Sequence, residues 1–468
     1  MTNLHDLSAV ELLKHYRAKT LSPSEVFADL EAHISRWEPH IKALYAYDPE
    51  SARKEAAAST QRWAKGSAAG PLDGVPVTVK ENIASKGIPV PLGTAAMPLT
   101  PAAQDAPPPA RLREAGAIIF SKTTMPDLGM TSSGVSSFHP LTRNPWDLTK
   151  NPGGSSSGAG AAGAAGYGPL HVGTDIGGSV RLPAGWCGLV GLKPSLGRVP
   201  IDPPYVARCA GPMTRTVDDT ALLMTVLAKP DHRDGMSLPV QDIDWTNLSA
   251  GLKGKRIGLL LDAGVGMAVE PEVKAAVEAA AKWFADQGAI VEPVAPLMTR
   301  AIMQGLDTFF RVRSWADIEP MPAETRAKIH PYTLTWAEGG AKLSGVDAIR
   351  GFNQTMELRR LAALVFGTID YLVSPTAPLP AFAAENCSPG NDPQRPFEHI
   401  AFTVPWNMTE QPAVSINAAF TASGLPIGVQ IIGRRHDDHG VLRLAKAWET
   451  ARGPITKWPK PPAAAGGA

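Results

Sequence analysis

One run of small residues, from Gly153 to Pro194, constrains this chain more than any other segment: GGSSSGAGAAGAAGYGPLHVGTDIGGSVRLPAGWCGLVGLKP. It holds four serines in glycine-rich settings, which are Ser155, Ser156, Ser157 and Ser179. No acid–serine–histidine pattern surrounds them. Glycine beside serine lets backbone N–H groups turn inward around a reacting oxygen, because glycine tolerates backbone conformations that a Cβ forbids. We expect the small residues 159–166 to form a helix that packs tightly beneath such a site.

A lysine upstream ends an apolar segment, GVPVTVK at 74–80, for which we predict a turn and a buried strand within 72–83. An isolated lysine at a strand end more often extends its ammonium to water. A lysine held in apolar surroundings loses hydration, which lowers its pKa and allows the neutral amine to act as a base. Ser179, which could otherwise cap a helix, follows two glycines, as a pocket of backbone donors requires. Together these residues indicate a serine hydrolase whose base is Lys80.

Helices and strands are predicted to alternate along the chain. Capping patterns at Ser8 and Ser22 begin two helices within the first forty residues. Strand 255–261, helix 271–287 and strand 289–294 form a β-α-β unit. We therefore predict the α/β class, with a mixed, largely parallel central sheet covered by helices on both faces. Further elements are expected as helices at 110–115 and 440–452 and strands at 117–120, 170–172, 371–373 and 427–432.

The chain shows no internal repeat and no linker that would divide it, so we expect one large domain over residues 1–458. Its helical N-terminal segment, 1–65, is expected to pack on the rest of that domain. The last residues, 459–468 (PKPPAAAGGA), cannot bury enough surface to order themselves and are predicted to be a disordered tail.

Composition excludes several classes of partner. A net charge of +1 supplies no basic field for nucleic acid or anionic lipid, and no apolar run approaches the ~20 residues of a membrane span. The N-terminus lacks the apolar core of a signal peptide, and three cysteines without metal-like spacing favour a reducing compartment, so we predict a cytoplasmic protein. The G-x-G-x-x-G at 158–163 follows a turn rather than a strand, so no dinucleotide cofactor is predicted.

Taken together, several motifs resemble the amidase signature family almost throughout their length. They are GGSS (153–156), GTDIGGSVRLPA (173–184), GLVGLKP (188–194), GPLDGVPVTVKEN (70–82), TRNPWD (142–147), YLVSPTAP (371–378), FTVPWNMTEQPA (402–413) and GLPIGVQIIG (424–433). The resemblance extends from about residue 10 to about residue 450. It implies the amidase signature fold and a Ser-cisSer-Lys triad, with Lys80 as base, Ser155 as bridging serine beside a cis peptide bond, and Ser179 as nucleophile.

The resemblance also implies positions around the triad. The backbone N–H groups of Ile176, Gly177, Gly178 and Ser179 would form the oxyanion hole. The loop from Gly129 to Ser132 would line the acyl pocket, with Met130, Thr131 and Ser132 touching substrate.

Some residues depart from the family pattern or keep two interpretations. Glu81 follows the lysine where aspartate is usual, and Ala159 replaces a serine. Ser157 stands where glycine is usual, and a structural hydrogen bond is the favoured role for its hydroxyl. Arg181 either clamps a substrate carboxylate or joins a buried ion pair. Cys187 is interpreted as a small core residue.

The predicted function is hydrolysis of a small-molecule carboxylic amide through a serine acyl-enzyme, which releases an acid and ammonia or an amine. The resemblance implies no metal, no organic cofactor and a homodimer. Aromatic residues between 200 and 370 favour an apolar or aryl amide: Tyr205, Phe309, Phe310, Trp315 and Trp336. The alternative function is the ammonia-releasing subunit of a multi-subunit tRNA-dependent amidotransferase. A non-enzymatic role would need a disabled triad, whereas Lys80, Ser155 and Ser179 are all present.

Overall fold

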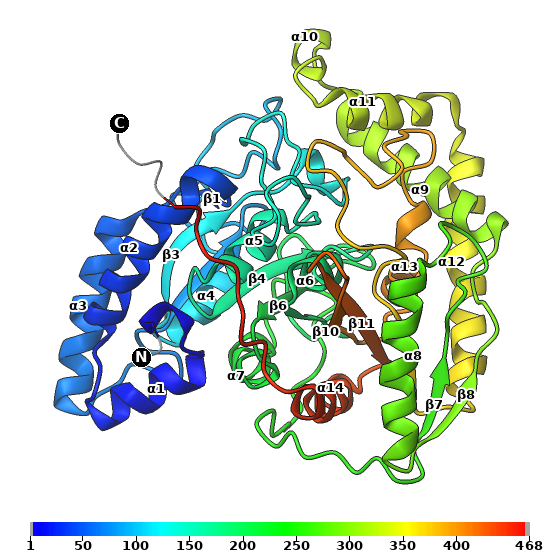
Figure 1. Cartoon of the computed structure of the whole chain (residues 1–468). Coiled ribbons are helices and arrows are strands. Elements are labelled where there is room, and N and C mark those ends of the chain that lie inside the picture. Colours follow the sequence, from blue (N-terminus) through cyan, green and yellow to red (C-terminus); the bar gives the residue numbers. More distant parts are fainter. Residues whose placement is uncertain (1–2, 464–468) are drawn as a thin grey trace.

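A single twisted sheet of 11 strands runs through the protein, whose computed structural model describes residues 3–463 (Figure 1). In spatial order the strands are β1 (Leu44–Tyr45), β3 (Ile118–Thr123), β2 (Pro76–Lys80), β4 (Leu170–Asp175), β6 (Cys209–Thr214), β5 (Val190–Lys193), β10 (Ala413–Phe420), β11 (Pro426–Gly433), β9 (Tyr371–Pro375), β7 (Arg256–Leu259) and β8 (Ile290–Pro293). The predicted mixed α/β class is confirmed, and residues far apart in sequence meet in this one sheet.

The sheet is less parallel than predicted. Strand β2 runs parallel to β3 and β4, and β7 runs parallel to β8 and β9. Between these two groups, neighbouring strands from β4 through β6, β5, β10 and β11 to β9 are antiparallel. Strands β10 and β11 are joined by a short turn, and only an antiparallel pair can be closed that way. The β-α-β unit predicted at 255–294 lies at one flank of the sheet, and the prediction drawn from it missed the antiparallel centre.

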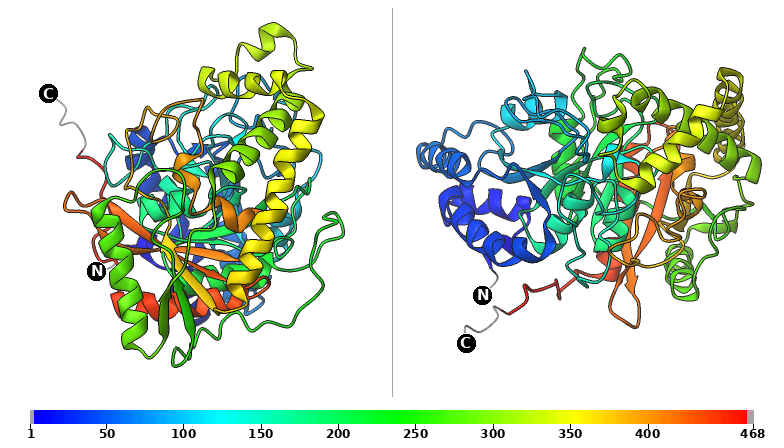
Figure 2. Two further views of the ribbon diagram at one scale, coloured as in Figure 1. Left: turned by 90° about the vertical axis from the view of Figure 1, so that its right-hand side faces the viewer. Right: turned by 90° about the horizontal axis from the view of Figure 1, so that it is seen from above.

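Helices cover both faces of the sheet (Figures 1 and 2). They are α1 (Ala9–Ala18), α2 (Pro23–Ile41), α3 (Pro49–Lys65), α4 (Pro107–Glu114), α5 (Ser157–Ala165), α6 (Arg181–Cys187), α7 (Val217–Leu227), α8 (Pro271–Asp286), α9 (Arg300–Ile318), α10 (Ala323–Arg326), α11 (Pro331–Glu338), α12 (Gly345–Phe366), α13 (Val404–Met408) and α14 (Asp438–Arg452). The long helices α9 and α12 pack against each other at one side of the molecule (Figure 2).

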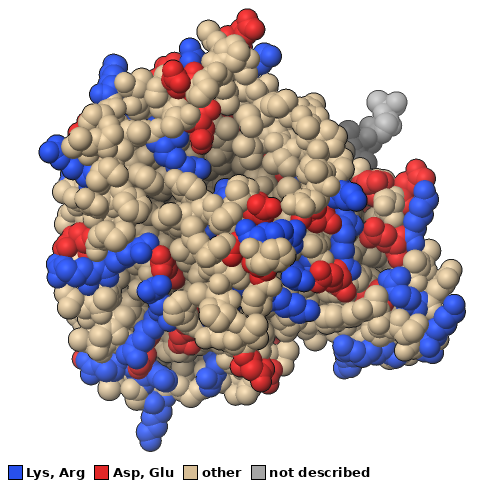
Figure 3. All heavy atoms as spheres, turned by 180° about the vertical axis from the view of Figure 1, so that it is seen from behind, with Lys and Arg blue, Asp and Glu red and all other residues tan. Residues whose placement is uncertain are grey.

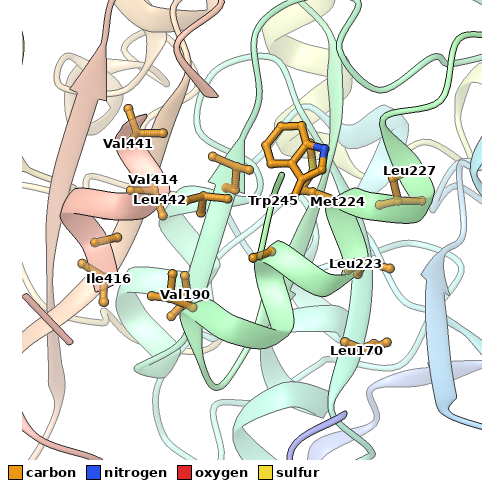
Figure 4. Close-up of a cluster of buried hydrophobic side chains, with 14 of the residues drawn as sticks. Leu170, Val190, Leu223, Met224, Leu227, Trp245, Val414, Ile416, Val441 and Leu442 are labelled. Atoms are coloured by element: carbon orange, nitrogen blue, oxygen red, sulfur yellow. The ribbon is translucent and has the colours of Figure 1, made fainter. Parts of the chain in front are cut away.

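Two large apolar clusters hold the layers together. One joins the sheet to α1, α4, α7, α8 and α14. Figure 4 shows part of it, with Leu223 of α7, Leu442 of α14, and Val190 and Val414 of the sheet among its side chains. The other joins α6, α9, α12 and α13, with Phe310 and Trp406 among its buried members. The site described below lies beside this second cluster.

The predicted helix of small residues is present as α5, all of whose residues are buried. At Gly158 a Cβ would lie 2.3 Å from the carbonyl oxygen of Ala43 and 2.4 Å from the backbone nitrogen of Thr124. Both backbone atoms are fixed by neighbouring structure, so only glycine allows α5 to approach so closely. The two capping boxes predicted at Ser8 and Ser22 are also present, at the starts of α1 and α2.

Surface charge is mixed, in keeping with the net charge of +1. On the face shown in Figure 3, basic and acidic side chains lie interspersed rather than in separate fields. Within residues 3–463, no helix combines the length and the apolar character needed to cross a membrane. Residues 459–463 of the predicted tail carry no helix or strand, and 464–468 lie outside the described residues.

Candidate active site

Lys80 and Ser155 meet at the carboxyl end of strand β2. Lys80 is the last residue of β2, and Ser155 follows a cis peptide bond from Gly154, just before α5 begins. Lys80 Nζ lies 2.7 Å from Ser155 Oγ and 3.1 Å from Oγ1 of Thr174, on the neighbouring strand β4. Thr174 was not predicted, although it stands one residue before the DIGGS motif in the same segment.

The surroundings of Lys80 are suited to a neutral amine. The side chain is fully buried, and no carboxylate within residues 3–463 forms an ion pair with it. Burial lowers the pKa of Lys80 from 10.5 to about 7; the charges of Asp175 and Glu81 oppose this shift, and that of Arg208 adds to it. An amine with this pKa is partly unprotonated at neutral pH and can accept a proton.

Ser179 lies in the turn between β4 and α6. Its backbone carbonyl accepts a hydrogen bond of 3.2 Å from the backbone N–H of Ser156, which places the turn beside Ser155. Ser179 is 9 % exposed and lines a cavity, so its hydroxyl is accessible from the site. The hydroxyls of Ser155 and Ser179 are not hydrogen-bonded to each other within the described structure. Catalytic hydrogen bonds are often longer without substrate and shorten when it binds.

Three of the four backbone N–H groups predicted as oxyanion donors are unpaired within the described residues. The backbone N–H groups of Ile176, Gly177 and Ser179 make no hydrogen bond to residues 3–463. The N–H of Gly178 instead donates to Asp175 Oδ1 at 2.8 Å, so it is not free to bind an oxyanion. Gly178 has a different role, because its φ is +132° and a Cβ there would lie 2.6 Å from Thr403 Oγ1.

A buried ion pair fixes this turn. Asp175 accepts two hydrogen bonds from the Arg181 guanidinium, at 3.0 and 2.9 Å, and others from the backbone N–H groups of Val180 and Arg181. Burial alone would raise the pKa of the Asp175 carboxyl, but Arg181 and the N–H of Val180 hold it well below its ordinary value. Arg181 also donates to Gln430 Oε1 at 2.7 Å and to the carbonyl of Thr403 at 2.9 Å. Of the two interpretations of Arg181, the structure supports the ion pair.

A narrow cavity of about 50 Å³ opens onto Ser179, Ile176 and Gly177. The three predicted substrate-binding residues, Met130, Thr131 and Ser132, line it together with Gly129. Its remaining lining comes from α9 and from the segment between β9 and β10: Phe310, Arg313, Pro396, Phe397, Ile400 and Val404. A separate depression of about 640 Å³, between the N-terminal residues and α14, contains none of the predicted site residues.

The aromatic residues predicted to favour an aryl substrate have different positions. Phe310 lines the cavity. Phe309 packs against Phe352, and Trp336 packs against Phe397. The other two aromatic side chains face arginines: Tyr205 lies beneath Arg313, and Trp315 lies beneath Arg326.

The residues that depart from the family pattern have structural partners. Glu81 accepts hydrogen bonds from the backbone N–H groups of Leu92 and Gly93 and lies 2.7 Å from His139 Nε2. Ser157 Oγ donates to the carbonyl of Thr124 at 3.3 Å, which agrees with the structural role favoured from the sequence.

Cys187 is buried in the core, as predicted. Its thiol donates to the carbonyl of Pro152 at 3.3 Å, within a buried apolar cluster that includes Ala159 and Ala184. The three cysteines are all free and buried. Residues 3–463 hold no group of three or more His, Cys, Asp or Glu side chains arranged for a metal ion.

This fold and this site define an amide-cleaving hydrolase. The Amidase family model matches residues 25–442, and the chain belongs to this family, whose members are the amidase signature enzymes. The expectation drawn from the sequence motifs is confirmed over nearly the whole chain.

Relatives of two kinds match at similar levels. An acylamidase of Rhodococcus erythropolis is 32 % identical over 467 residues, covering 96 % of each chain. A Glutamyl-tRNA(Gln) amidotransferase subunit from Chloroflexus aurantiacus is 33 % identical over 498 residues, covering 98 % of each chain. Among solved structures, a bacterial aryl acylamidase of the amidase signature family superposes with a TM-score of 0.89 at 30 % identity, over 96 % of this chain and 97 % of the other.

Proposed function

We propose that this protein hydrolyses a small-molecule amide through an acyl-enzyme on Ser179, with Ser155 and Lys80 as the proton relay. The contact of 2.7 Å between Lys80 Nζ and Ser155 Oγ, in a fully buried setting, carries the proposal. Two other lysines are equally buried, but Lys122 donates to the carbonyl of Ile83 and Lys193 to that of Pro194. Burial alone therefore does not distinguish Lys80, whereas its contact with a serine hydroxyl beside Ser179 does.

The reaction follows from these positions. Neutral Lys80 takes the proton of Ser155, which takes the proton of Ser179, and Ser179 Oγ attacks the amide carbonyl. The negative oxygen that forms is stabilised by the free N–H groups of the turn, at Ile176, Gly177 and Ser179. Ser155 then returns a proton to the leaving nitrogen, the C–N bond breaks, and an ester to Ser179 remains. Water hydrolyses this ester by the same relay in reverse, which releases the acid.

The second candidate is an ammonia-releasing subunit of a tRNA-dependent amidotransferase. The 33 % identity to such a subunit over 98 % of both chains is the observation that favours it. The same triad chemistry would then act on glutamine, and the ammonia would pass to another protein. The net charge of +1 favours the independent amidase, because it supplies no strong basic field for tRNA, and basic and acidic side chains are interspersed on the face shown in Figure 3.

A panel of amides tests both candidates. It contains aliphatic, aryl and aminoacyl amides and glutamine, and release of acid and ammonia or amine is measured with purified protein. We expect turnover of at least one class, its loss in Ser179→Ala, and its retention in Ser157→Ala, whose wild-type hydroxyl donates to the carbonyl of Thr124. Turnover of glutamine alone would favour the amidotransferase component. Full activity of Ser179→Ala would overturn the assignment of the nucleophile.

A further inference from the structure

One charged side chain lines the cavity at Ser179. Arg313, on α9, is half-buried there, whereas the other lining groups are apolar or neutral. The guanidinium carbon of Arg313 lies 4.1 Å from the centre of the Tyr205 ring. A cation over an aromatic face is held in place without being neutralised, so its N–H groups remain available to a ligand.

A second arginine strengthens the positive charge at this place. The guanidinium carbon of Arg208 lies 5.8 Å from the centre of the same Tyr205 ring, and one of its N–H groups donates to the carbonyl of Pro203. Burial lowers the pKa of Arg208, and the nearby charge of Arg313 lowers it further. The charge of Arg208 also lowers the pKa of Lys80.

Neither arginine has an acidic partner among the described residues. Within residues 3–463, no carboxylate comes within 4.0 Å of Arg208 or Arg313, although most other arginines of the chain form such pairs. The nearest acidic residue along α9, Asp317, is exposed one turn beyond Arg313 and forms no ion pair with it. Asp234 attracts Arg208 from beyond ion-pair distance and offsets this charge only in part. The two neighbouring cations repel each other, and an anionic ligand reduces that cost.

We propose that the acyl part of the substrate carries a carboxylate, which Arg313 binds with the support of Arg208. This inference rests on the proposed amidase function and narrows its substrate to monoamides of dicarboxylic acids. The planar, forked donors of arginine match a carboxylate in two parallel hydrogen bonds. The hydrocarbon part of the acyl chain would lie against Met130, Phe310 and Phe397, which give the cavity its apolar wall. We assign the carboxylate to the acyl part rather than to the leaving amine, because the cavity opens directly onto Ser179 and the acyl part becomes bonded to this serine.

Matched substrate pairs test this inference. Monoamides of dicarboxylic acids of increasing length are compared with unbranched fatty amides of the same carbon number, and kcat and KM are measured for each. We expect at least a ~10-fold higher kcat/KM for the charged member at the best length, since hydrogen bonds between charged groups are the strong ones. Arg313→Met should raise KM for the charged member at least ~10-fold more than for its neutral partner, whereas Arg313→Lys should retain part of the preference.

Arg17→Met is the matched control, because Arg17 is an exposed arginine on the distant helix α1 and its loss removes the same charge. It should preserve the preference for the carboxylate. Equal kcat/KM for both members of every pair, or an equal loss in Arg313→Met and Arg17→Met, would overturn the inference while leaving the amidase function intact.

A binding measurement separates this inference from the proposed function. Titration calorimetry with glutarate, the plain dicarboxylate, needs no turnover. Binding to the wild type that falls at least ~10-fold in Arg313→Met but not in Arg17→Met would support carboxylate recognition even if no amide were hydrolysed. If amides are hydrolysed but glutarate and the uncharged 1,5-pentanediol bind the wild type equally, the carboxylate site is wrong and the amidase function stands.

Discussion

The protonation of Lys80 makes the pH dependence of catalysis calculable. A pKa of about 7 leaves about half of the Lys80 amines neutral at pH 7, whereas the ordinary value of 10.5 would leave about one in 3,000. Burial of this side chain therefore raises the population of active base at neutral pH by roughly three orders of magnitude. We expect kcat/KM to rise about tenfold per pH unit on the acidic side and to level off at about pH 8.

The assay uses an uncharged amide, so that the substrate does not titrate, from about pH 5 to about pH 9. Circular dichroism at each pH verifies that the protein stays folded. Lys122→Met is the control, because burial lowers the pKa of Lys122 to about 7 as well, yet its amine donates to the carbonyl of Ile83 rather than to a serine. The inflection should remain in this variant. A rate independent of pH over the whole range, or an inflection that disappears in Lys122→Met, would refute the assignment of Lys80 as the base.

Three further variants test residues in and around the site. Comparison of the unfolding free energies of the wild type and Lys80→Met should reveal the cost of burying the amine. From about pH 7 to about pH 10, the stability of the wild type relative to the variant should rise by up to ~1.4 kcal/mol per pH unit. The reason is that the unfolded chain still binds a proton on Lys80 in this range, whereas the folded chain has lost it. Equal pH dependence of the two proteins would contradict the low pKa. Arg181→Met leaves the buried carboxylate of Asp175 without its partner and should lower the unfolding free energy by ~3–5 kcal/mol in a denaturant titration. Ser157→Ala removes one hydrogen bond to Thr124 and should cost ~1 kcal/mol while changing kcat/KM less than about twofold; a tenfold loss would mean that this hydroxyl acts in catalysis.

Local sequence patterns predicted the part of the site that is built from one continuous segment and one strand. The valines before Lys80 predicted the buried strand β2, and the glycines and alanines after Ser157 predicted the close packing of α5. Both patterns act through neighbours in sequence, so they can be recognised without the fold. The contact between Lys80 and Ser155 spans 75 positions and was implied only by the resemblance to the family.

The residues that the sequence did not reveal depend on long-range geometry. Arg313 stands on an amphipathic helix whose pattern shows which face is buried but not that this face ends at the cavity. The engagement of the Gly178 N–H by Asp175 depends on the conformation of one turn, which the glycines permit without specifying. The antiparallel centre of the sheet was missed because strands β5, β6 and β10 were not predicted.

The most direct test of the account locates the acyl group during turnover. The protein is mixed with an activated ester, the reaction is stopped in acid within the first turnover, and the mass of the intact chain and of its peptides is measured. The account predicts one added acyl group on the peptide that contains Ser179, and none in Ser179→Ala. An acyl group on Ser155 or Ser156, or an unmodified chain during active turnover, would contradict it.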